Sequence, residues 1–339
     1  MDTTATTPTR GDDLPAQLER LGREHPRLLD RLDQDLVAAW AEDLRRAAGG
    51  RDDFGPAAAG GRGERYVRAQ QDRLMTRAHG IDQLLRLICD PAEQRGQVVL
   101  DLLGGDGLVR RVAGRTGHHG LSIMTCDLSP LMVEAAWEAG LPAVLQSASR
   151  LLFRSGSVDG VLLAYGTHHL PESDRLLAAE ESLRVLRPGG VFVMHDFEVG
   201  GPMDVWFEQV VDRYSATGHR FAHFTREELT ACLDKAGFED VRVVELADPY
   251  RVVADSPRAA DLGMGRYLLD MYGLVGLEDS LGAERAEEWT VQRAREVFGV
   301  PGPDGVRPVI EPRRDPGTGG WHLEVPRRAL VAVGRRPER

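Results

Sequence analysis

VVLDLLGGDG, residues 98–107, is the stretch that decides the fold class. A continuous hydrophobic run ends at Asp101 and passes into a glycine-rich loop. A short apolar run of this kind is typical of a buried parallel strand. Glycines directly after such a strand let backbone N–H groups approach a polar or anionic ligand. We therefore expect a ligand-binding loop in which Gly104, Gly105 and Gly107 make the close approach.

The segments that follow alternate between apolar strands and amphipathic helices. The expected strands cover residues 121–128, 142–146, 158–166, 191–197 and 240–246, and the expected helices cover 131–140, 173–186, 203–216 and 225–237. This alternation is typical of an α/β fold with a doubly wound parallel sheet covered on both faces. WHLEVPRRALVAVGRR (321–336) is expected to add the final strand as an antiparallel edge.

Composition and periodicity divide the chain into five parts. We expect a disordered tail (1–13), a helical N-terminal extension or lid (14–95), the sheet core (96–246), a helical insertion (247–318) and a final strand with a tail (319–339). The insertion is interpreted as a lid or as the surface of a homodimer.

The charge balance and the cysteines limit the classes of partner. The net charge is −11 and no stretch is dense in Lys or Arg, which argues against nucleic acid and membrane surfaces as partners. Cys89, Cys126 and Cys232 lie far apart, as in a reducing compartment. Because no apolar run is long enough for a membrane span and no signal peptide is evident, we expect a cytoplasmic protein.

The residues around the loop distinguish between candidate ligands. Asp127 ends the next strand about 20 residues after the loop, where an acid can bind a ribose diol. A dinucleotide site needs a third glycine, which does not follow Gly107, and a phosphate-binding P-loop needs a GK[ST] ending. Asp101 at the strand end opposes a pyrophosphate but attracts an ammonium group. These features favour S-adenosylmethionine over NAD, so a nucleotide-dependent oxidoreductase is the less favoured alternative.

Four motifs follow one another in the chain: VLDLLGGDG, CDLSPLMVEAA, SVDGVLLAYGTHHLPE and LRVLRPGGVFVMHDF. Their order and spacing resemble class I S-adenosylmethionine-dependent methyltransferases, and most of all the small-molecule, methyltransferase type 11-like group. The resemblance covers residues 96–245. It implies a Rossmann-like, doubly wound, seven-stranded methyltransferase sheet with N-terminal helices and a helical insertion before the last strand. It also implies S-adenosyl-L-methionine as the cofactor.

The resemblance assigns the cofactor contacts residue by residue. The implied cofactor-binding residues are Asp101, Gly104, Gly105 and Gly107 at the amino-acid end, Asp127 at the ribose, Leu128, Met132 and Ala148 at the adenine, and Tyr165. Leu103 stands where the family commonly has its first glycine, and we interpret this as a shift of the close approach onto Gly104 and Gly105. The family often has an acid near Ser147 that contacts the adenine amino group. That acid is absent here, and the backbone of Ala148 is expected to contact the ring in its place.

Histidines at the ends of two later strands are the candidate catalytic residues. Ligands of doubly wound sheets bind at the carboxyl ends of the strands, so the acceptor is expected near the ends of 158–166 and 191–197. A base that removes the acceptor's proton is commonly a histidine. His195 with Asp196 is the first candidate, and His168 or His169 is the second. The alternative is that these histidines only line the cofactor pocket.

The same residues raise the question of a metal. We expect no metal ligands, and keep as an alternative an iron site of His195, Asp196 and a third histidine (His168, His169 or His223) in a 2-keto acid C-methyltransferase. Adjacent strand residues point to opposite faces, so His195 and Asp196 can act together only where the strand has ended. His219 and His223 could contact substrate, although helix capping at Thr225 explains that segment equally well.

The sequence therefore predicts an S-adenosylmethionine-dependent methyltransferase (EC 2.1.1) that carries out O- or C-methylation of a small-molecule acceptor. We expect it to act in bacterial secondary metabolism, such as antibiotic biosynthesis. A protein that binds the cofactor without catalysis, as a scaffold or regulator, is the alternative from another functional class.

Overall fold

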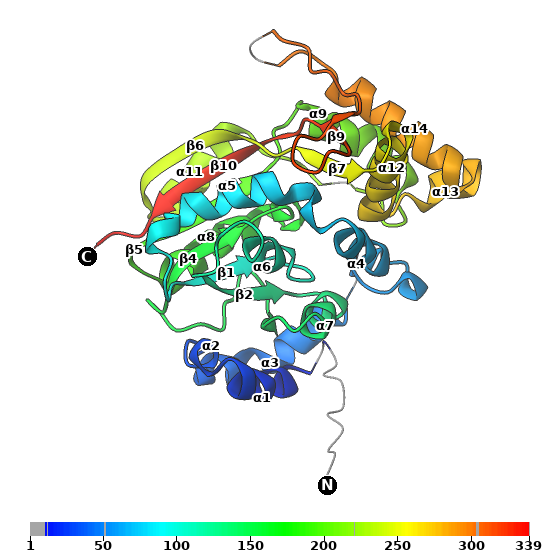
Figure 1. Ribbon diagram of the computed structural model, residues 1–339. Coiled ribbons are helices and arrows are strands. Elements are labelled where there is room, and N and C mark those ends of the chain that lie inside the picture. The colour runs from blue at the N-terminus through cyan, green and yellow to red at the C-terminus, as the bar shows by residue number, and fades with distance from the viewer. Residues whose placement is uncertain (1–10, 12, 51, 220, 303–304, 339) are drawn as a thin grey trace.

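A computed structural model describes residues 11, 13–50, 52–219, 221–302 and 305–338 (Figure 1). Its centre is a seven-stranded sheet in the order β3-β2-β1-β4-β5-β10-β6. The strands are β1 (Val98–Leu102), β2 (Ser122–Asp127), β3 (Ala143–Leu145), β4 (Val158–Leu163), β5 (Leu186–Asp196), β6 (Glu239–Ala247) and β10 (Arg328–Arg335). β1 to β5 pair in parallel, and β10 runs antiparallel to both β5 and β6. The expected seven-stranded, doubly wound α/β sheet is confirmed.

Helices cover both faces of this sheet because its strands are apolar on both sides. Along β1, Leu100 and Leu102 enter one hydrophobic core and Val99 enters the other, as strand alternation requires. The helices α7 (Pro130–Glu138), α8 (Glu172–Val185) and α11 (Arg226–Ala236) pack on the first face, and α5 (Ala78–Ile88) and α6 (Leu108–Ala113) pack on the second. The strand order reverses between β1 and β4, where doubly wound sheets bind ligands.

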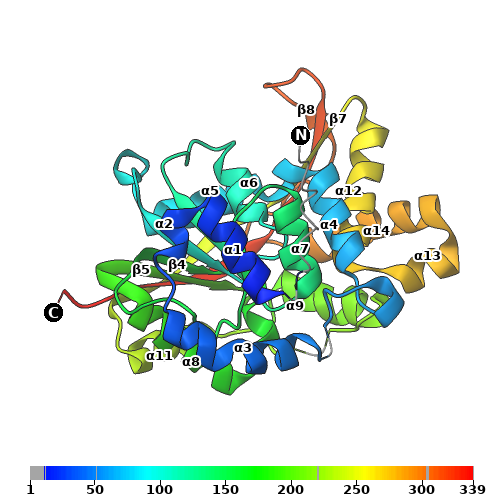
Figure 2. The same ribbon diagram turned by 90° about the horizontal axis from the view of Figure 1, so that it is seen from below.

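The N-terminal extension contributes to both layers, because its last helix, α5, packs on the second face. The helices before it are α1 (Leu14–Glu24), α2 (Pro26–Leu29), α3 (Gln34–Ala48) and α4 (Gly63–Asp72). Leucines of α1 to α3 join the same core as α7 and α8. Figure 2 shows these three helices in dark blue on the near side of the molecule. Pro26 begins α2, as expected of a residue that lacks a backbone N–H. Residues 1–10 and 12 of the expected disordered tail lie outside the described residues.

The insertion forms a second hydrophobic core beside the sheet (Figure 1). Its helices are α12 (Pro257–Tyr272), α13 (Val275–Leu281) and α14 (Ala283–Phe298). It also contains β7 (Tyr250–Ala254) and β8 (Arg313–Arg314), which pair with β9 (Trp321–Val325) in a three-stranded sheet. The expectation of a purely helical insertion is therefore corrected. So is the single strand over 321–336: it breaks at Pro326, and only β10 joins the main sheet.

Shorter helical segments complete the described chain. They are α9 (Pro202–Trp206), the π-helical turn η5 (Phe207–Val211), α10 (Asp212–Tyr214) and the 3₁₀ turns η1 (Ala57–Ala59), η2 (Leu74–Arg77), η3 (Pro91–Glu93) and η4 (Thr167–His169). The helix expected over 203–216 thus contains a π-helical turn, a feature often found at functional sites. Nowhere in the described ranges is a helix both long and apolar enough to span a membrane.

Candidate functional site

A cavity of about 840 Å³ lies at the carboxyl ends of β1, β2 and β4. The sheet core contributes Leu103, Gly105, Asp127, Leu128, Met132 and Tyr165 to its wall, followed by His168 and His169 of η4. The N-terminal extension contributes Phe54, Arg62, Tyr66 and Arg77, and the end of α12 contributes Met271 and Tyr272. Segments far apart in the sequence therefore enclose one space next to the glycine-rich loop.

The glycines of the loop have different roles. Gly105 lines the cavity with φ of 57°, and its N–H donates to Asp127 Oδ2 at 2.8 Å. A Cβ atom on Gly104 would lie 2.7 Å from the carbonyl oxygen of Asp101, so this glycine lets the loop pack on its own strand. Gly107 adopts φ of 79° as the N-cap of α6 and packs against Leu141. Gly105 is thus the glycine that faces the cavity.

A buried acid, Asp101, and a half-buried acid, Asp127, lie next to this loop. Asp101 is 2% exposed, and its Oδ2 has no hydrogen-bond partner among the described residues. Burial and the nearby Asp127 raise the pKa of Asp101 well above its usual value. Burial also raises the pKa of Asp127 to about 6, against the hydrogen bonds from Ser129 and Gly105, which lower it. This pair can attract a cation and accept hydrogen bonds from hydroxyl groups.

The apolar positions predicted beside the adenine divide into two groups. Leu128 and Met132 line the cavity next to Asp127. Ala148 is buried at 5% exposure and is not part of the described cavity wall. The structure brings Leu128 and Met132, but not Ala148, to the cavity surface.

Comparison with known proteins agrees with this geometry. Residues 100–194 match a family model described as a methyltransferase domain. This segment contains the glycine loop, Asp127 and the histidines of η4. These residues form a methyltransferase domain of the class I S-adenosylmethionine-dependent type. The predicted family, fold and cofactor are therefore confirmed.

The curated relatives match only part of this chain, and the chain spans less than two thirds of their own length. It is 31% identical over 179 residues to the ubiquinone/menaquinone biosynthesis C-methyltransferase UbiE of Brucella canis, which corresponds to 44% of this chain and 65% of the relative. It is 29% identical over 188 residues to an arsenite methyltransferase of Halobacterium salinarum, with 51% and 45% covered. A phosphoethanolamine N-methyltransferase of Haemonchus contortus, solved with S-adenosylhomocysteine, superimposes with a TM-score of 0.45 at 18% identity, with 75% and 52% covered.

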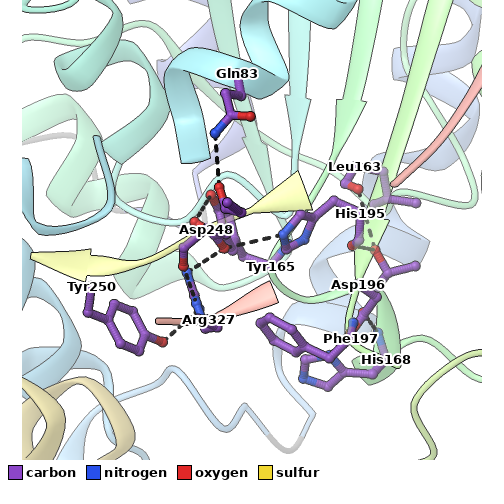
Figure 3. A network of polar contacts seen from close by, with 12 residues as sticks. Gln83, Leu163, Tyr165, His168, His195, Asp196, Phe197, Asp248, Tyr250 and Arg327 are labelled. Atoms are coloured by element: carbon purple, nitrogen blue, oxygen red, sulfur yellow. Dashed lines mark hydrogen bonds and ion pairs between the residues drawn. The ribbon is translucent and has the colours of Figure 1, made fainter. Parts of the chain in front are cut away.

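The adjacent residues His195 and Asp196 point in opposite directions in this methyltransferase (Figure 3). His195 is fully buried; its Nδ1 accepts a hydrogen bond from the Tyr165 N–H, and its Nε2 lies 3.4 Å from Asp248 Oδ2. Asp196 instead binds Nδ1 of His168 at 2.8 Å. The predicted pairing of His195 with Asp196 is therefore not formed, because neighbouring side chains of β5 alternate between faces. For the same reason, the iron site built on both residues is not assembled.

Four histidines cluster at and behind one part of the cavity wall instead. The ring centroid of His168 lies 4.5 Å from that of His169, 4.8 Å from that of His219 and 5.2 Å from that of His223. Burial and the neighbouring His168 lower the pKa of His219 to about 2 and that of His169 well below its usual value. The imidazoles of His169 and His219 are therefore uncharged at neutral pH.

Asp196 fixes the position of His168 within this cluster. It accepts hydrogen bonds from the backbone N–H of His168 at 2.7 Å and from that of Phe197 at 2.7 Å. Burial by itself would raise the pKa of Asp196, but the imidazole of His168 lowers it below its usual value. Asp196 is fully buried, so it acts on the cavity only through His168.

Three buried arginines of the cavity wall were not predicted. Arg62, Arg77 and Arg327 are 7%, 2% and 2% exposed. Arg327 pairs with the buried Asp248, but no ion pair within the described ranges includes Arg62 or Arg77. Arg77 donates a hydrogen bond to Tyr66 Oη and lies over the ring of Tyr165. No local motif marks these arginines, because Arg62 and Arg77 of the N-terminal extension lie far along the chain from Arg327.

Proposed function

We propose that this chain is an enzyme of class EC 2.1.1 that transfers a methyl group from S-adenosylmethionine to a small-molecule acceptor. The observation that carries the proposal is the shared cavity. Gly105 and Asp127 lie on one part of its wall, and His168 and His169 lie on another. Holding two reactants close and aligned supplies much of the rate of such a substitution.

The loop residues fit the cofactor chemically. The unpartnered Oδ2 of Asp101 suits the ammonium group of the amino-acid end, and Asp127 suits the ribose hydroxyls. Leu128 and Met132 offer an apolar surface for the adenine. Gly104 and Gly107 allow the close packing of the loop. Tyr165 lines the cavity together with the loop residue Gly105. When bound, S-adenosylmethionine supplies an electrophilic methyl group on a sulfonium.

The acceptor side suits an oxygen or carbon nucleophile that must lose a proton. His168 and His169 face this side with a third imidazole, from His219. These groups activate the acceptor, and His195 supports Tyr165 from behind the wall. This assignment gives His168 and His169 precedence over His195 and Asp196.

Arg62 and Arg77 favour a negatively charged group in the cavity, either on the acceptor or on the amino-acid end of the cofactor. Arg62 and Arg77 are buried without a carboxylate partner in an ion pair of the described chain, and buried cations are stabilised by an anionic group. The methionine carboxylate and an acidic acceptor both fit this requirement. A dedicated cavity built by chain-specific segments agrees with our expectation of bacterial secondary metabolism, such as antibiotic biosynthesis.

The test of this function is calorimetry on the full chain with S-adenosylhomocysteine and, separately, NAD. We expect one S-adenosylhomocysteine site and no NAD binding. Asp127→Ala should weaken binding by about 1.5–3 kcal/mol, since one charged hydrogen-bond acceptor is lost. Asp279→Ala, an exposed carboxylate on α13, is the matched control and should bind normally.

Two results would redirect the proposal. A protein that does not bind S-adenosylhomocysteine would overturn it. A protein that binds this ligand tightly, yet methylates no member of a panel of phenols, enols and keto acids, would instead favour the scaffold or regulator.

A further inference from the structure

The cluster of histidines at the acceptor side holds more unpaired ligand atoms than a hydrogen-bonding role explains. Both ring nitrogens of His219 and Nε2 of His223 are buried without a hydrogen-bond partner among the described residues. A buried polar atom left unpaired costs about 1–3 kcal/mol, so each such atom in a native protein calls for a missing water or ion. Their concentration around one cavity points to a shared ligand.

We infer that His168, His169 and His219 bind a divalent transition-metal ion at the wall of the cavity. The inference rests on the proposed function, which it deepens. Each of the three offers a ring nitrogen, and these atoms lie within 4.8 Å of one another. All three residues line the cavity, so an ion there would be open to the acceptor.

A hydrogen bond to Asp196 orients the ring of His168 as a metal ligand. Nδ1 of His168 binds the Asp196 carboxylate at 2.8 Å, which leaves Nε2 as the ligand atom. Metal-binding histidines almost always make such a bond with their other nitrogen. Asp196 is thus a positioning residue that acts through His168.

Packing fixes the second ligand. The ring of His219 stacks on Phe207 with centroids 3.9 Å apart, at the π-helical turn η5. Neither of its ring nitrogens is engaged by another described group. An ion would satisfy one of them without moving the ring away from Phe207.

A second ligand set lies behind the first and competes with it. His168, Asp196 and His223 also bring ligand atoms within 4.8 Å, but all three are buried. His223 Nδ1 is bound to Asp204 at 2.6 Å. His223 and Asp196 are not part of the described cavity wall, so an ion held there would not reach an acceptor as directly.

Ligand chemistry limits the metal and its use. Imidazoles suit zinc, iron, nickel and copper, and three protein ligands with an open position are typical of catalytic sites. An acceptor oxygen would bind the open position and release its proton to solvent more readily. The C–S bond to the methyl group breaks as the bond to the acceptor forms, a neutral thioether leaves, and no atom changes oxidation state. The imidazoles then activate the acceptor through the ion, in place of accepting its proton directly.

The experiment is metal binding by the full chain, without cofactor or acceptor. Protein stripped with a chelator is titrated with Zn²⁺ by calorimetry and with Co²⁺ by visible absorption. We expect one site, with affinity at least 10-fold weaker in His169→Ala and in His219→Ala. Asp196→Asn should weaken binding by about 10- to 100-fold through His168. His119→Ala, an exposed histidine away from the cavity, is the matched control and should bind normally.

Several outcomes would overturn the inference. One is a wild-type protein that binds neither ion; another is full affinity in both His169→Ala and His219→Ala. Affinity lost only in His223→Ala would move the ion to the buried set and overturn the assigned ligands. Thermal unfolding of each variant shows whether it is folded. S-adenosylhomocysteine binding without metal binding defeats this inference alone, whereas metal binding without S-adenosylhomocysteine binding defeats the proposed function.

Discussion

Two non-glycine residues of the cavity wall, Leu103 and Tyr165, adopt positive φ angles of 57° and 63°. Side chains rarely adopt this conformation, which costs about 1–3 kcal/mol and is often found at functional sites. Leu103 contacts the turn at Gly166, just after Tyr165. The strained backbone of both residues thus borders the space between the glycine loop and η4.

Leu103 gives a stability prediction with a built-in control. At an ordinary position, glycine is less stable than alanine by about 0.4–1 kcal/mol. At φ of 57° the order should reverse. The free energy of unfolding, measured by urea denaturation, should therefore be about 1 kcal/mol higher for Leu103→Gly than for Leu103→Ala. Both variants lose the same packing of the leucine side chain. If Leu103→Ala is the more stable of the two, the positive φ is contradicted.

Asp127 predicts how cofactor binding depends on pH. Its carboxyl pKa is about 6 in the free protein, and only the ionised form can accept hydrogen bonds from two ribose hydroxyls. The affinity for S-adenosylhomocysteine should therefore be constant above about pH 7 and fall up to about tenfold per unit below pH 6. Calorimetry across this range measures the effect, and Asp127→Asn should show a weaker pH dependence. An affinity that is flat down to pH 5 would contradict the assigned role of Asp127.

At the scale of elements, α4 of the N-terminal extension is tied to α12 of the insertion (Figure 2). Asp270 of α12 is 2% exposed and pairs with Arg65 and Arg68 of α4 and with Arg266 of its own helix. Arg62 also donates to the carbonyl oxygen of Met271. These contacts hold together two walls of the cavity that are more than 180 residues apart in the sequence.

Replacing Asp270 tests this attachment. Asp270→Asn leaves three arginines without their shared carboxylate, so the free energy of unfolding should fall by about 2 kcal/mol. This value is below that for a fully buried pair, because the arginines are 29–51% exposed. Glu284→Gln removes an exposed partner of Arg258 and should change stability by less than about 0.5 kcal/mol. Equal urea midpoints for the two variants would show that the attachment contributes nothing.

At the scale of the whole molecule, the site is one cavity with walls from four parts of the chain, including Arg327 of its final part. The sheet core supplies the loop and Asp127, the N-terminal extension supplies Phe54 and Tyr66, and the end of α12 supplies Tyr272. Enclosure of this kind excludes water and selects the acceptor. We therefore propose that the extension and the insertion act as the lid of the site, as expected from their position in the sequence. Use of the insertion as a homodimer surface stays a prediction.

The sequence by itself determined the main sheet, its order of strands and helices along the chain, and the glycine-rich loop with its two acids. Asp101 and Asp127 lie at the carboxyl ends of β1 and β2, and Gly105 lies in the loop after β1, so local pattern was enough to place them at one edge of the sheet. Only the tertiary structure decided which histidines and arginines gather at the cavity. It turned His195 away from Asp196, joined His219 to His168, and brought Arg62, Arg77 and Arg327 to the cavity. The physical reason is that these contacts depend on how distant segments pack, and no local periodicity or spacing records that packing.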